Sequence, residues 1–260
     1  MAVYTALFGN YDNIVEPKES FPGCNFILFT DQNNLKSKIW QTKLVNEKNE
    51  HPAIANRKYK FFPHYFLPDY EISLYVDANI FIRKNPIDLA VKYLKDYSIA
   101  IPKHFSRNCL YDEAIEIIKT SKGNISDITS QINFYKSKDL KSSFGLTENN
   151  IIYRKHNDSK IIELMNQWWA ELHKWPCKRD QLSFMYLVYK NDIDIKIMDE
   201  TARGGNYFKM MLHKKDLDNG SISNLVNPYN CYLLNHPNLI GKKKDVYIKK
   251  FLKTFNRLLF

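Results

Sequence analysis

The sequence predicts an α/β protein, because short buried strands alternate with helices and because polar residues directly follow several of the strands. Apolar, β-branched and aromatic runs predict strands over residues 2–7, 25–30, 40–45, 72–76, 98–101, 150–154 and 193–198. Segments with helical spacing predict helices over residues 53–62, 87–94, 111–120, 126–136, 158–172 and 182–189. No internal repeat or low-complexity linker interrupts this order, so we expect one domain over residues 1–240 and an extension over residues 241–260.

The first strand runs straight into a glycine-containing loop, Phe8-Gly9-Asn10-Tyr11-Asp12. A nucleotide commonly lies in such a loop, although any tight turn can also require one glycine. The second strand ends at Thr30, and Asp31 follows it. The Asp31 carboxylate can accept hydrogen bonds from a base or ribose, or it can cap the next turn, and both interpretations stay open.

The helix predicted over residues 53–62 ends at Pro63 and carries two basic residues on one face. Arg57 and Lys60 are three residues apart, so they are neighbours on the helix surface. Because this helix leads into the strand over residues 72–76, both side chains can reach a diphosphate at the end of that strand. The alternative is an ordinary solvated face.

An aspartate and an asparagine follow the strand over residues 72–76, at Asp77 and Asn79. In open α/β sheets, ligands bind beyond the carboxyl ends of the strands. A carboxylate and a carboxamide at this spacing can both offer oxygen to Mg²⁺ or Mn²⁺, which in turn can hold a diphosphate. Otherwise Asp77 caps a turn and Asn79 is an ordinary loop residue.

The strand over residues 98–101 leads into a loop that carries His104 and Arg107. Binding residues concentrate on loops of this kind. By contrast, Trp168 and Trp169 occur in a helix with apolar residues at helical spacing, which indicates a place in the core rather than a sugar platform.

Further candidate residues flank the later elements. Glu148 precedes the strand over residues 150–154, and Asp180 and Gln181 precede the helix over residues 182–189. An acid such as Asp180 is also favoured at a helix N-terminus by the helix dipole alone. The paired glycines of Arg203-Gly204-Gly205-Asn206 indicate a loop that approaches a ligand.

The net charge is +10, from 38 basic and 28 acidic residues, and it favours anionic partners such as nucleotide phosphates, nucleic acid or an anionic membrane. The four cysteines are far apart and form no C-x-x-C pair, so free thiols in a reducing compartment are expected. The N-terminus lacks the features of a signal peptide, and no run is long enough to span a bilayer. A cytoplasmic protein is therefore expected.

The extension over residues 241–260 predicts a basic amphipathic helix, beginning at Asp245. Its apolar residues Ile248, Phe251 and Leu252 lie near one side, and lysines occupy much of the rest. Such a helix can lie at the inner face of an anionic membrane. It can equally dock on the domain's own core or join a further domain.

Taken in order, these segments resemble glycosyltransferases of the GT-A fold, whose D-x-D motif holds the metal of a nucleotide-sugar. That fold is Rossmann-like, with a mixed central sheet flanked by helices. More narrowly, the chain resembles the glycosyltransferase-like family that was formerly a domain of unknown function, the TOD1/MUCI70 type. The segments that carry the resemblance are Tyr4–Asp12, Phe29-Thr30-Asp31, Asn56–Lys60, Tyr75–Asn79, His104 with Arg107, and Arg179–Phe184. Asn79 departs from the pattern, because it replaces the second carboxylate of D-x-D and lowers the charge of the ligand set.

The resemblance implies a metal site for Mn²⁺ or Mg²⁺ at Asp77 and Asn79, completed by a histidine. His236, in the segment His236–Lys244, is similar to the histidine of some retaining GT-A enzymes, and His213 competes for the role. The residues expected to bind the donor are Thr5, Leu7, Gly9, Tyr11, Asp31, Arg57, Lys60, Ala78, His104, Arg107 and Lys244.

An inverting enzyme also needs a general base for the acceptor hydroxyl. Asp180 is the first candidate and Glu148 the second, whereas in a retaining enzyme Asp180 or Gln181 would position the sugar. The sequence leaves the stereochemistry open.

The expected function is metal-dependent transfer of a hexose from a nucleotide-sugar, a UDP-sugar by expectation, to a glycan or lipid-linked glycan. The expected setting is synthesis of a bacterial surface polysaccharide. One alternative is an inactive carbohydrate- or nucleotide-binding relative, which Asn79 allows. A nucleic-acid-binding protein is less favoured, because the basic residues are scattered and no helix-turn-helix, RRM or zinc-finger signature occurs.

Overall fold

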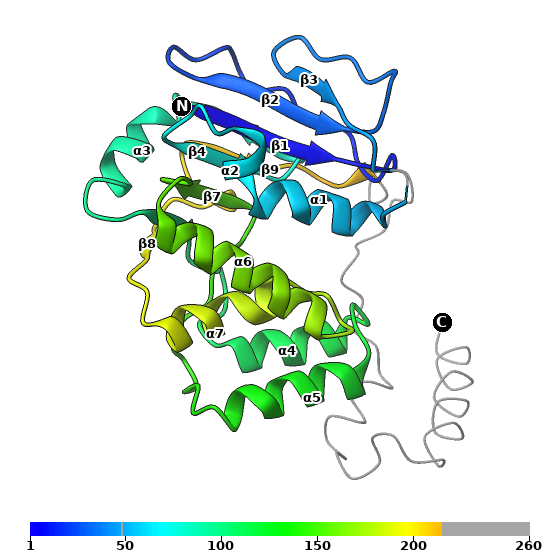
Figure 1. Cartoon of the computed structure of the whole chain (residues 1–260), viewed down its shortest axis with the longest axis vertical. Helices are drawn as coiled ribbons and strands as arrows, with labels where there is room; N and C mark the ends of the chain where they lie inside the picture. The colour runs from blue at the N-terminus through cyan, green and yellow to red at the C-terminus, as the bar shows by residue number, and fades with distance from the viewer. Residues whose placement is uncertain (48, 215–260) are drawn as a thin grey trace.

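The computed structural model describes residues 1–47 and 49–214, and within them seven strands form a mixed central sheet in the order β3-β2-β1-β4-β7-β6-β8 (Figure 1). These strands are β1 (Ala2–Leu7), β2 (Asn25–Thr30), β3 (Gln41–Leu44), β4 (Ser73–Val76), β6 (Ile99–Pro102), β7 (Ile151–Arg154) and β8 (Lys196–Met198). β7 runs antiparallel to both of its neighbours, β4 and β6, whereas the other pairs are parallel. The predicted α/β class and the mixed sheet flanked by helices are confirmed.

Helices begin where the sequence provides caps. His51 caps α1, Asn124 caps α5 and Asp158 caps α6, each by accepting a backbone N–H of the first turn. Pro63 ends α1, as predicted, but it also begins the short helix α2, which was not predicted. The helices are α1 (Pro52–Phe61), α2 (Pro63–Phe66), α3 (Ile87–Tyr93), α4 (Leu110–Lys119), α5 (Ile125–Lys136), α6 (Ser159–Lys174) and α7 (Gln181–Asn191).

The two faces of the sheet bury two separate cores, because successive side chains of a strand point to opposite faces. In β1, Tyr4 and Ala6 belong to a core that α1 covers next to the sheet and that continues through α6, α7, α4 and α5, which Figure 1 shows stacked away from the sheet. Val3 and Leu7 pack on the other face with α3 and with a small second sheet. That second sheet pairs β5 (Ile80–Ile82) with β9 (Phe208–Met210), a strand that was not predicted.

The direction of β7 decides where the polar residues gather. Because β7 is antiparallel, its N-terminal end lies at the same edge as the C-terminal ends of β1, β2, β4 and β6. We call this side of the sheet the carboxyl edge. The loops that meet there are those after β1, β2, β4 and β6 and the segment before β7.

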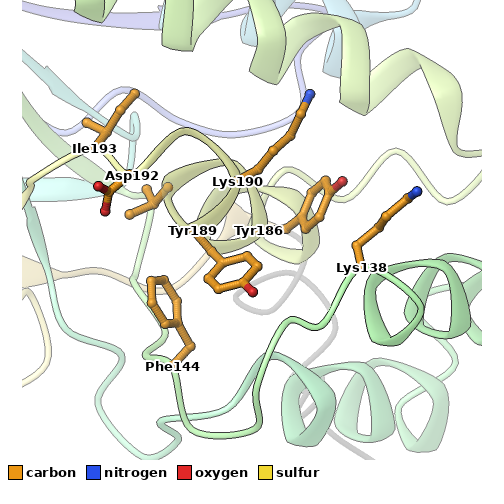
Figure 2. A pocket seen from close by; sticks show the side chains of 8 residues that line it. Lys138, Phe144, Tyr186, Tyr189, Lys190, Asp192 and Ile193 are labelled. Carbon is orange, nitrogen blue, oxygen red and sulfur yellow. The ribbon is translucent and has the colours of Figure 1, made fainter.

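Hollows on the described part of the molecule include two that bear on binding. One, of about 570 Å³, lies beside the loops after β1 and β2 and is lined mainly by Asn10, Asp12, Asn13, Gln32, Asn33 and Asn34. The other, of about 700 Å³, lies between the loop after α5 and the last turns of α7 (Figure 2).

The predicted boundary at residue 240 and the extension over residues 241–260 lie outside the residues that the structure describes, as do His236 and Lys244. Among the described helices, none combines the length and the apolar character needed to cross a bilayer.

Candidate active site

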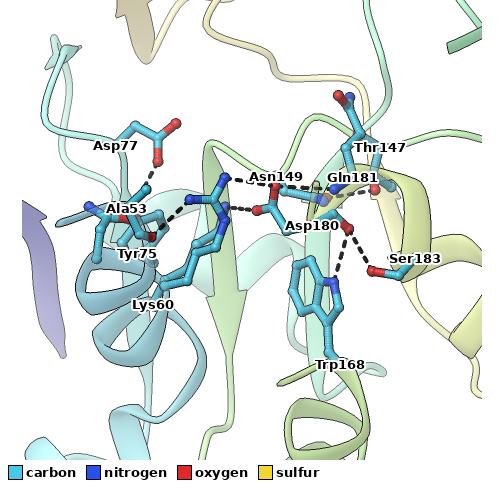
Figure 3. Close-up of polar contacts among 12 residues, drawn as sticks. Ala53, Lys60, Tyr75, Asp77, Thr147, Asn149, Trp168, Asp180, Gln181 and Ser183 are labelled. Carbon is cyan, nitrogen blue, oxygen red and sulfur yellow. Dashed lines mark hydrogen bonds and ion pairs between the residues drawn. The ribbon is translucent and has the colours of Figure 1, made fainter. Parts of the chain in front are cut away.

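Asp77 lies at the end of β4 and is held by the strand's own last tyrosine. The hydroxyl of Tyr75 donates to Asp77 Oδ1 at 2.8 Å, and the backbone N–H of Asp77 donates to the carbonyl of Asn150 at 2.9 Å (Figure 3). The Tyr75 hydroxyl also lies 3.2 Å from Asn56 Oδ1, but its single proton can serve only one of these acceptors fully. Asp77 itself is half-buried, so its carboxylate is both oriented and accessible.

Asn79 uses most of its polar atoms in hydrogen bonds to the backbone of Met211. Its side-chain Nδ2 donates to the carbonyl of Met211 at 2.9 Å, and the Met211 N–H donates to the Asn79 carbonyl at 2.8 Å. The residue is only 3% exposed. A cation could therefore use only its Oδ1.

Asp180 lies at the N-terminus of α7 and forms a buried ion pair with α1 (Figure 3). Lys60 Nζ donates to its Oδ2 at 2.6 Å, and Arg57 Nη2 lies 3.7 Å from its Oδ1. Burial alone would raise the pKa of Asp180, but the charges of Lys60 and Arg57 outweigh that effect and hold the pKa well below its ordinary value. The carboxylate is therefore ionised and fixed at neutral pH.

The backbone around Asp180 is fixed in turn by α6. The indole Nε1–H of Trp168 donates to the Asp180 carbonyl at 3.0 Å, and the ring is fully buried, as predicted for a core residue. Gln181, the next residue, donates from Nε2 to the carbonyl of Thr147 at 2.9 Å. This bond connects α7 to the segment before β7.

That segment, Thr147-Glu148-Asn149-Asn150, is buried and incompletely hydrogen-bonded. Glu148, Asn149 and Asn150 are each less than 9% exposed. Within residues 1–47 and 49–214, no hydrogen-bond partner is found for Glu148 Oε2, Asn149 Nδ2 or Asn150 Oδ1. Buried polar atoms without partners are uncommon and point to a missing ligand or water.

Glu148 is paired on its other oxygen with Arg203, whose Nε donates to Oε1 at 2.9 Å. Burial raises the pKa of Glu148 above its ordinary value, although the charge of Arg203 opposes the shift. The Arg203 guanidinium also lies over the Phe105 ring, 4.4 Å from its centroid. The predicted loop Arg203–Asn206 is thus joined to the carboxyl edge.

His104 and Arg107 lie in the loop after β6 and bond mainly to their own surroundings. His104 Nδ1 accepts the backbone N–H groups of Ser106 and Arg107, and Arg107 Nε donates to Glu113 at 2.6 Å. Burial, assisted by the charges of Arg107 and Arg203, lowers the pKa of His104 to about 4. The imidazole is therefore neutral at pH 7.

The loop after β1 is held by Asp31, which accepts the Gly9 N–H at 3.1 Å. Gly9 has a φ of +63°, and a Cβ at this position would lie 2.5 Å from Pro52 Cγ. Glycine is therefore needed both for the backbone angle and for the close approach of α1.

His213 and Lys214 contact this same loop through Asp12. His213 Nδ1 lies 2.5 Å from Asp12 Oδ2, and because a carboxylate can only accept, the ring donates the proton. The Lys214 N–H donates to Asp12 Oδ1 at 2.9 Å. Against the effect of burial, these bonds lower the pKa of Asp12.

The remaining residues expected to bind the donor differ in exposure. Thr5 and Leu7 are buried inside β1, at 0% and 3% exposed, so neither offers a ligand a side-chain surface. The carbonyl of Ala78 accepts the Val15 N–H at 3.0 Å. Tyr11 is 60% exposed beside His213.

The structure brings several predicted residues to the carboxyl edge, namely Gly9, Asp31, Arg57, Lys60, Asp77, Glu148, Asp180 and Gln181. It adds Tyr75, Asn149, Asn150 and Asp12, to which no individual role was assigned, and it brings in Arg203 from the loop predicted to approach a ligand. Asn149 and Asn150 adjoin Glu148 in the sequence, but only the antiparallel direction of β7 places them at this edge. No group of three or more His, Cys, Asp or Glu side chains arranged to hold a metal occurs within the part of the chain that is described.

Comparison with known proteins places these residues in a family context. Residues 1–213 match the model of a family described as TOD1/MUCI70, glycosyltransferase-like domain. A probable hexosyltransferase, MUCI70 of Arabidopsis thaliana, is 24% identical over 213 residues, which cover 71% of this chain and 36% of the relative. The chain thus spans about a third of the length of this curated relative.

Solved structures of glycosyltransferases show weaker likeness. The bifunctional glycosyltransferase WbbM matches with a TM-score of 0.49 and 11% identity, over 76% of this chain and 38% of WbbM. Mouse xyloside xylosyltransferase 1 matches with a TM-score of 0.42 and 7% identity, over 75% of this chain and 84% of that protein. The galactosyltransferase LgtC matches with a TM-score of 0.40 and 14% identity, over 72% and 70% of the two chains.

Proposed function

The chain belongs to the TOD1/MUCI70 glycosyltransferase-like domain family, and on that premise we propose that it transfers a hexose from a nucleotide-diphosphate sugar to a glycan acceptor. The hexose is supported by the description of the Arabidopsis relative as a probable hexosyltransferase. We further propose a GT-A type of site and a UDP-sugar donor. Synthesis of bacterial surface polysaccharide stays a hypothesis drawn from the sequence, and the curated relative is a plant protein.

The observation that carries the proposal is the set of unpartnered atoms in Glu148, Asn149 and Asn150. One carboxylate oxygen, one amide N–H group and one amide oxygen lie buried in consecutive residues, and Asn150 is bonded through its backbone to Asp77. Leaving one such group without a partner costs about 1–3 kcal/mol. Sugar hydroxyls both donate and accept, so a bound sugar can satisfy all three groups.

The basic residues of α1 supply positive charge for a leaving diphosphate. Lys60 is committed to Asp180 at 2.6 Å, whereas Arg57 is held more loosely at 3.7 Å. We therefore assign Arg57 to the diphosphate and Lys60 to the placement of Asp180. Charge arranged in advance in this way is usually the largest contribution to catalysis.

The hollow beside the loops after β1 and β2 is proposed for the nucleoside. Its lining of asparagine and glutamine amides offers both donors and acceptors to a base or ribose. Asp31 holds the loop after β1 by accepting the Gly9 N–H. We propose that the Asp31 carboxylate contacts the nucleoside beside that loop.

A divalent cation fits this site in part. Asp77 offers an oriented and accessible carboxylate at the end of β4. We propose Asp77 as a protein ligand with Asn79 Oδ1 in support, and either His213 or His236 as the histidine that the sequence resemblance implies. Such a cation would supply Lewis-acid stabilisation of the charge that grows on the diphosphate.

Glu148 is a better general base than Asp180 for an inverting transfer. The charges of Lys60 and Arg57 lower the pKa of Asp180 and so make it a weak base. Burial raises the pKa of Glu148 above its ordinary value, which makes it a stronger base. An effective base has a pKa near the working pH. We therefore assign Glu148 to the acceptor hydroxyl and assign Asp180 and Gln181 to positioning.

The test is release of UDP from a panel of UDP-hexoses with Mn²⁺, with and without glycan acceptors. Wild-type protein is expected to release UDP, and Asp77→Ala, as the assay control, is not. Binding of UDP without turnover on any sugar or acceptor would favour the inactive relative. A melting shift with single-stranded nucleic acid but none with UDP and Mn²⁺ would refute the proposal.

A further inference from the structure

The hollow between α5 and α7 is a second candidate binding site, separate from the carboxyl edge. It has a volume of about 700 Å³ and is lined by aromatic, basic and acidic side chains, mainly Phe144, Tyr186, Tyr189, Lys138, Lys190 and Asp192 (Figure 2). Small-molecule sites are typically clefts of about 300–1,000 Å³ with a largely apolar lining and a few polar groups. We call this hollow the aromatic groove.

The rings that line the aromatic groove pack on neighbouring rings. Tyr186 is 4% exposed and stacks on Tyr135 with 4.2 Å between ring centroids. Phe144 packs edge-on against Tyr189 at 5.3 Å, yet it remains 42% exposed. Gly145, with a φ of +124°, adopts a backbone angle that favours glycine in the loop that presents Phe144. The Tyr186 ring is therefore held by packing on Tyr135, and Phe144 leaves part of its ring open to a ligand.

Polar groups surround these rings without being used elsewhere. Figure 2 shows the Tyr186 ring between the side chains of Lys190 and Lys138. Across residues 1–47 and 49–214, the hydroxyls of Tyr186 and Tyr189, the Lys190 ammonium and the Asp192 carboxylate have no hydrogen-bond or ion-pair partner. The groove thus offers donors and acceptors together with ring faces.

The charges of the aromatic groove nearly balance. Two lysines are opposed by Asp192 and by the C-terminal carbonyl groups of α7, which carry partial negative charge. An anionic ligand would therefore gain little, whereas an uncharged polyol can use every group. A sugar ring has one apolar face for stacking and hydroxyls that both donate and accept, which matches this lining.

The aromatic groove is joined to the candidate active site by two short connections. Phe144 is followed after two residues by Thr147, which accepts a hydrogen bond from Gln181. α7 begins at Gln181 and reaches the groove at Tyr189, a distance of about 12 Å at ~1.5 Å per residue. A short oligosaccharide can span this distance.

We propose that the aromatic groove binds an uncharged saccharide stretch of the acceptor, several sugar units away from the reacting end. This inference rests on the proposed function for the identity of the ligand as acceptor. The aromatic groove would be remote from the reacting atoms, and it would favour acceptors that are long enough to reach it.

Binding of neutral hexasaccharides to the full chain tests the proposal by saturation-transfer NMR and calorimetry. The probes are maltohexaose, cellohexaose, mannohexaose and xylohexaose, with a tetragalacturonate as the anionic comparison. At least one neutral probe is expected to bind, and Tyr189→Ala and Phe144→Ala are each expected to weaken it about fivefold to tenfold. Tyr65→Ala removes a ring that is 66% exposed on α2 and is expected to leave affinity unchanged.

The possible outcomes separate this inference from the proposed function, because UDP binding and UDP release without acceptor are measured on the same variants. The proposal is overturned if wild-type protein binds no neutral probe, if both groove variants bind as tightly as wild type, or if only the tetragalacturonate binds. A change of mass in light scattering for Phe144→Ala would instead make the groove an interface between copies. Phe144 lies on an exposed loop, so its variant keeps the fold and the result is readable.

Discussion

At the scale of single residues, the candidate site depends on Tyr75, which a strand buries completely and which nevertheless donates to Asp77. A phenylalanine at this position keeps the packing and removes only the hydroxyl. A substitution at position 75 can therefore test the orientation of Asp77 without disturbing the packing of the sheet.

Tyr75→Phe is expected to lower affinity for a UDP-sugar with Mn²⁺ about tenfold or more, since a hydrogen bond to a charged group contributes ~1.5–3 kcal/mol. Calorimetric titration of the donor measures the effect. Tyr153→Phe is the matched control, because it loses a buried bond of 3.0 Å to the Pro86 carbonyl on the other face of the sheet. Equal losses in both variants would count against a role for Tyr75 in orienting Asp77.

Glu148→Gln is expected to reduce turnover by ~10²-fold or more while donor binding changes little, as is usual when a general base is removed. Because burial raises the pKa of Glu148, the pKa that governs the acid limb of the kcat/KM profile should lie above the ordinary glutamate value of ~4.3. Glu163→Gln changes an exposed glutamate of α6 and serves as the control. NMR of the product should show an inverted anomeric centre, and retention would remove the base role from Glu148.

Asp180→Asn is expected to destabilise the protein at pH 7 by about 3–5 kcal/mol, because it leaves the buried Lys60 ammonium without its carboxylate. The folded pKa of Asp180 lies below its unfolded value of ~3.9. Its stabilisation is therefore complete above that value and is lost as the pH falls toward the folded pKa.

Urea unfolding of wild type and Asp180→Asn between pH 3 and pH 7 measures this difference. The gap between the two proteins should narrow on acidification below pH ~4. Asp199→Asn removes a carboxylate that is 90% exposed and pairs with Lys103, and it should change stability by less than ~1 kcal/mol. A gap for Asp180→Asn that does not depend on pH would contradict the ion-pair explanation.

At the scale of elements, the loop after β1 and helix α1 are fitted to each other through Gly9 and Pro52. Gly9→Ala is expected to cost about 1–3 kcal/mol, since it combines a strained φ with a contact of 2.5 Å to Pro52. It should also weaken nucleotide binding, because this loop borders the hollow proposed for the nucleoside. Thermal melting with and without UDP reports both effects.

A double variant separates the two causes. Pro52→Ala combined with Gly9→Ala removes the 2.5 Å contact with Pro52 Cγ but keeps the 2.9 Å contact with Cβ and the strained angle, so it should recover only part of the stability. Full recovery would show that the backbone angle and the remaining Cβ contact cost nothing at this position.

The elements that the sequence predicted correctly are those with local signals of their own. β1, β2 and β4 are buried runs that end in polar residues, and Asp77 and Asp180 were found because each lies at the end of an element. β9 was missed because only Phe208 is buried in it, and its strand character comes from pairing with β5. Asn149 and Asn150 were missed because the direction of β7 depends on its neighbours in the sheet and not on its own residues.

At the scale of the whole molecule, the net charge of +10 and the predicted basic helix over residues 241–260 bear on where the protein works. The helix lies outside the described residues, so its membrane role remains a prediction from sequence. The protein is expected to sediment with anionic liposomes at low salt and to be released as salt screens the charge. Truncation after Lys244 should abolish sedimentation and spare transfer to a soluble acceptor, whereas equal sedimentation of both forms would rule out the helix as the anchor.

The segment that follows β9 also affects when, during synthesis, the protein becomes able to bind nucleotide. Met211 bonds to Asn79 across 132 residues of sequence, and His213 bonds to Asp12 across 201. Contacts of such high sequence separation are slow to form, because the chain between them must first be ordered. A nascent chain on the ribosome can therefore complete its central sheet while its first loop still lacks its partner. We expect the ability to bind nucleotide to appear late in synthesis, after residue 213 has emerged, so that partial chains remain catalytically silent.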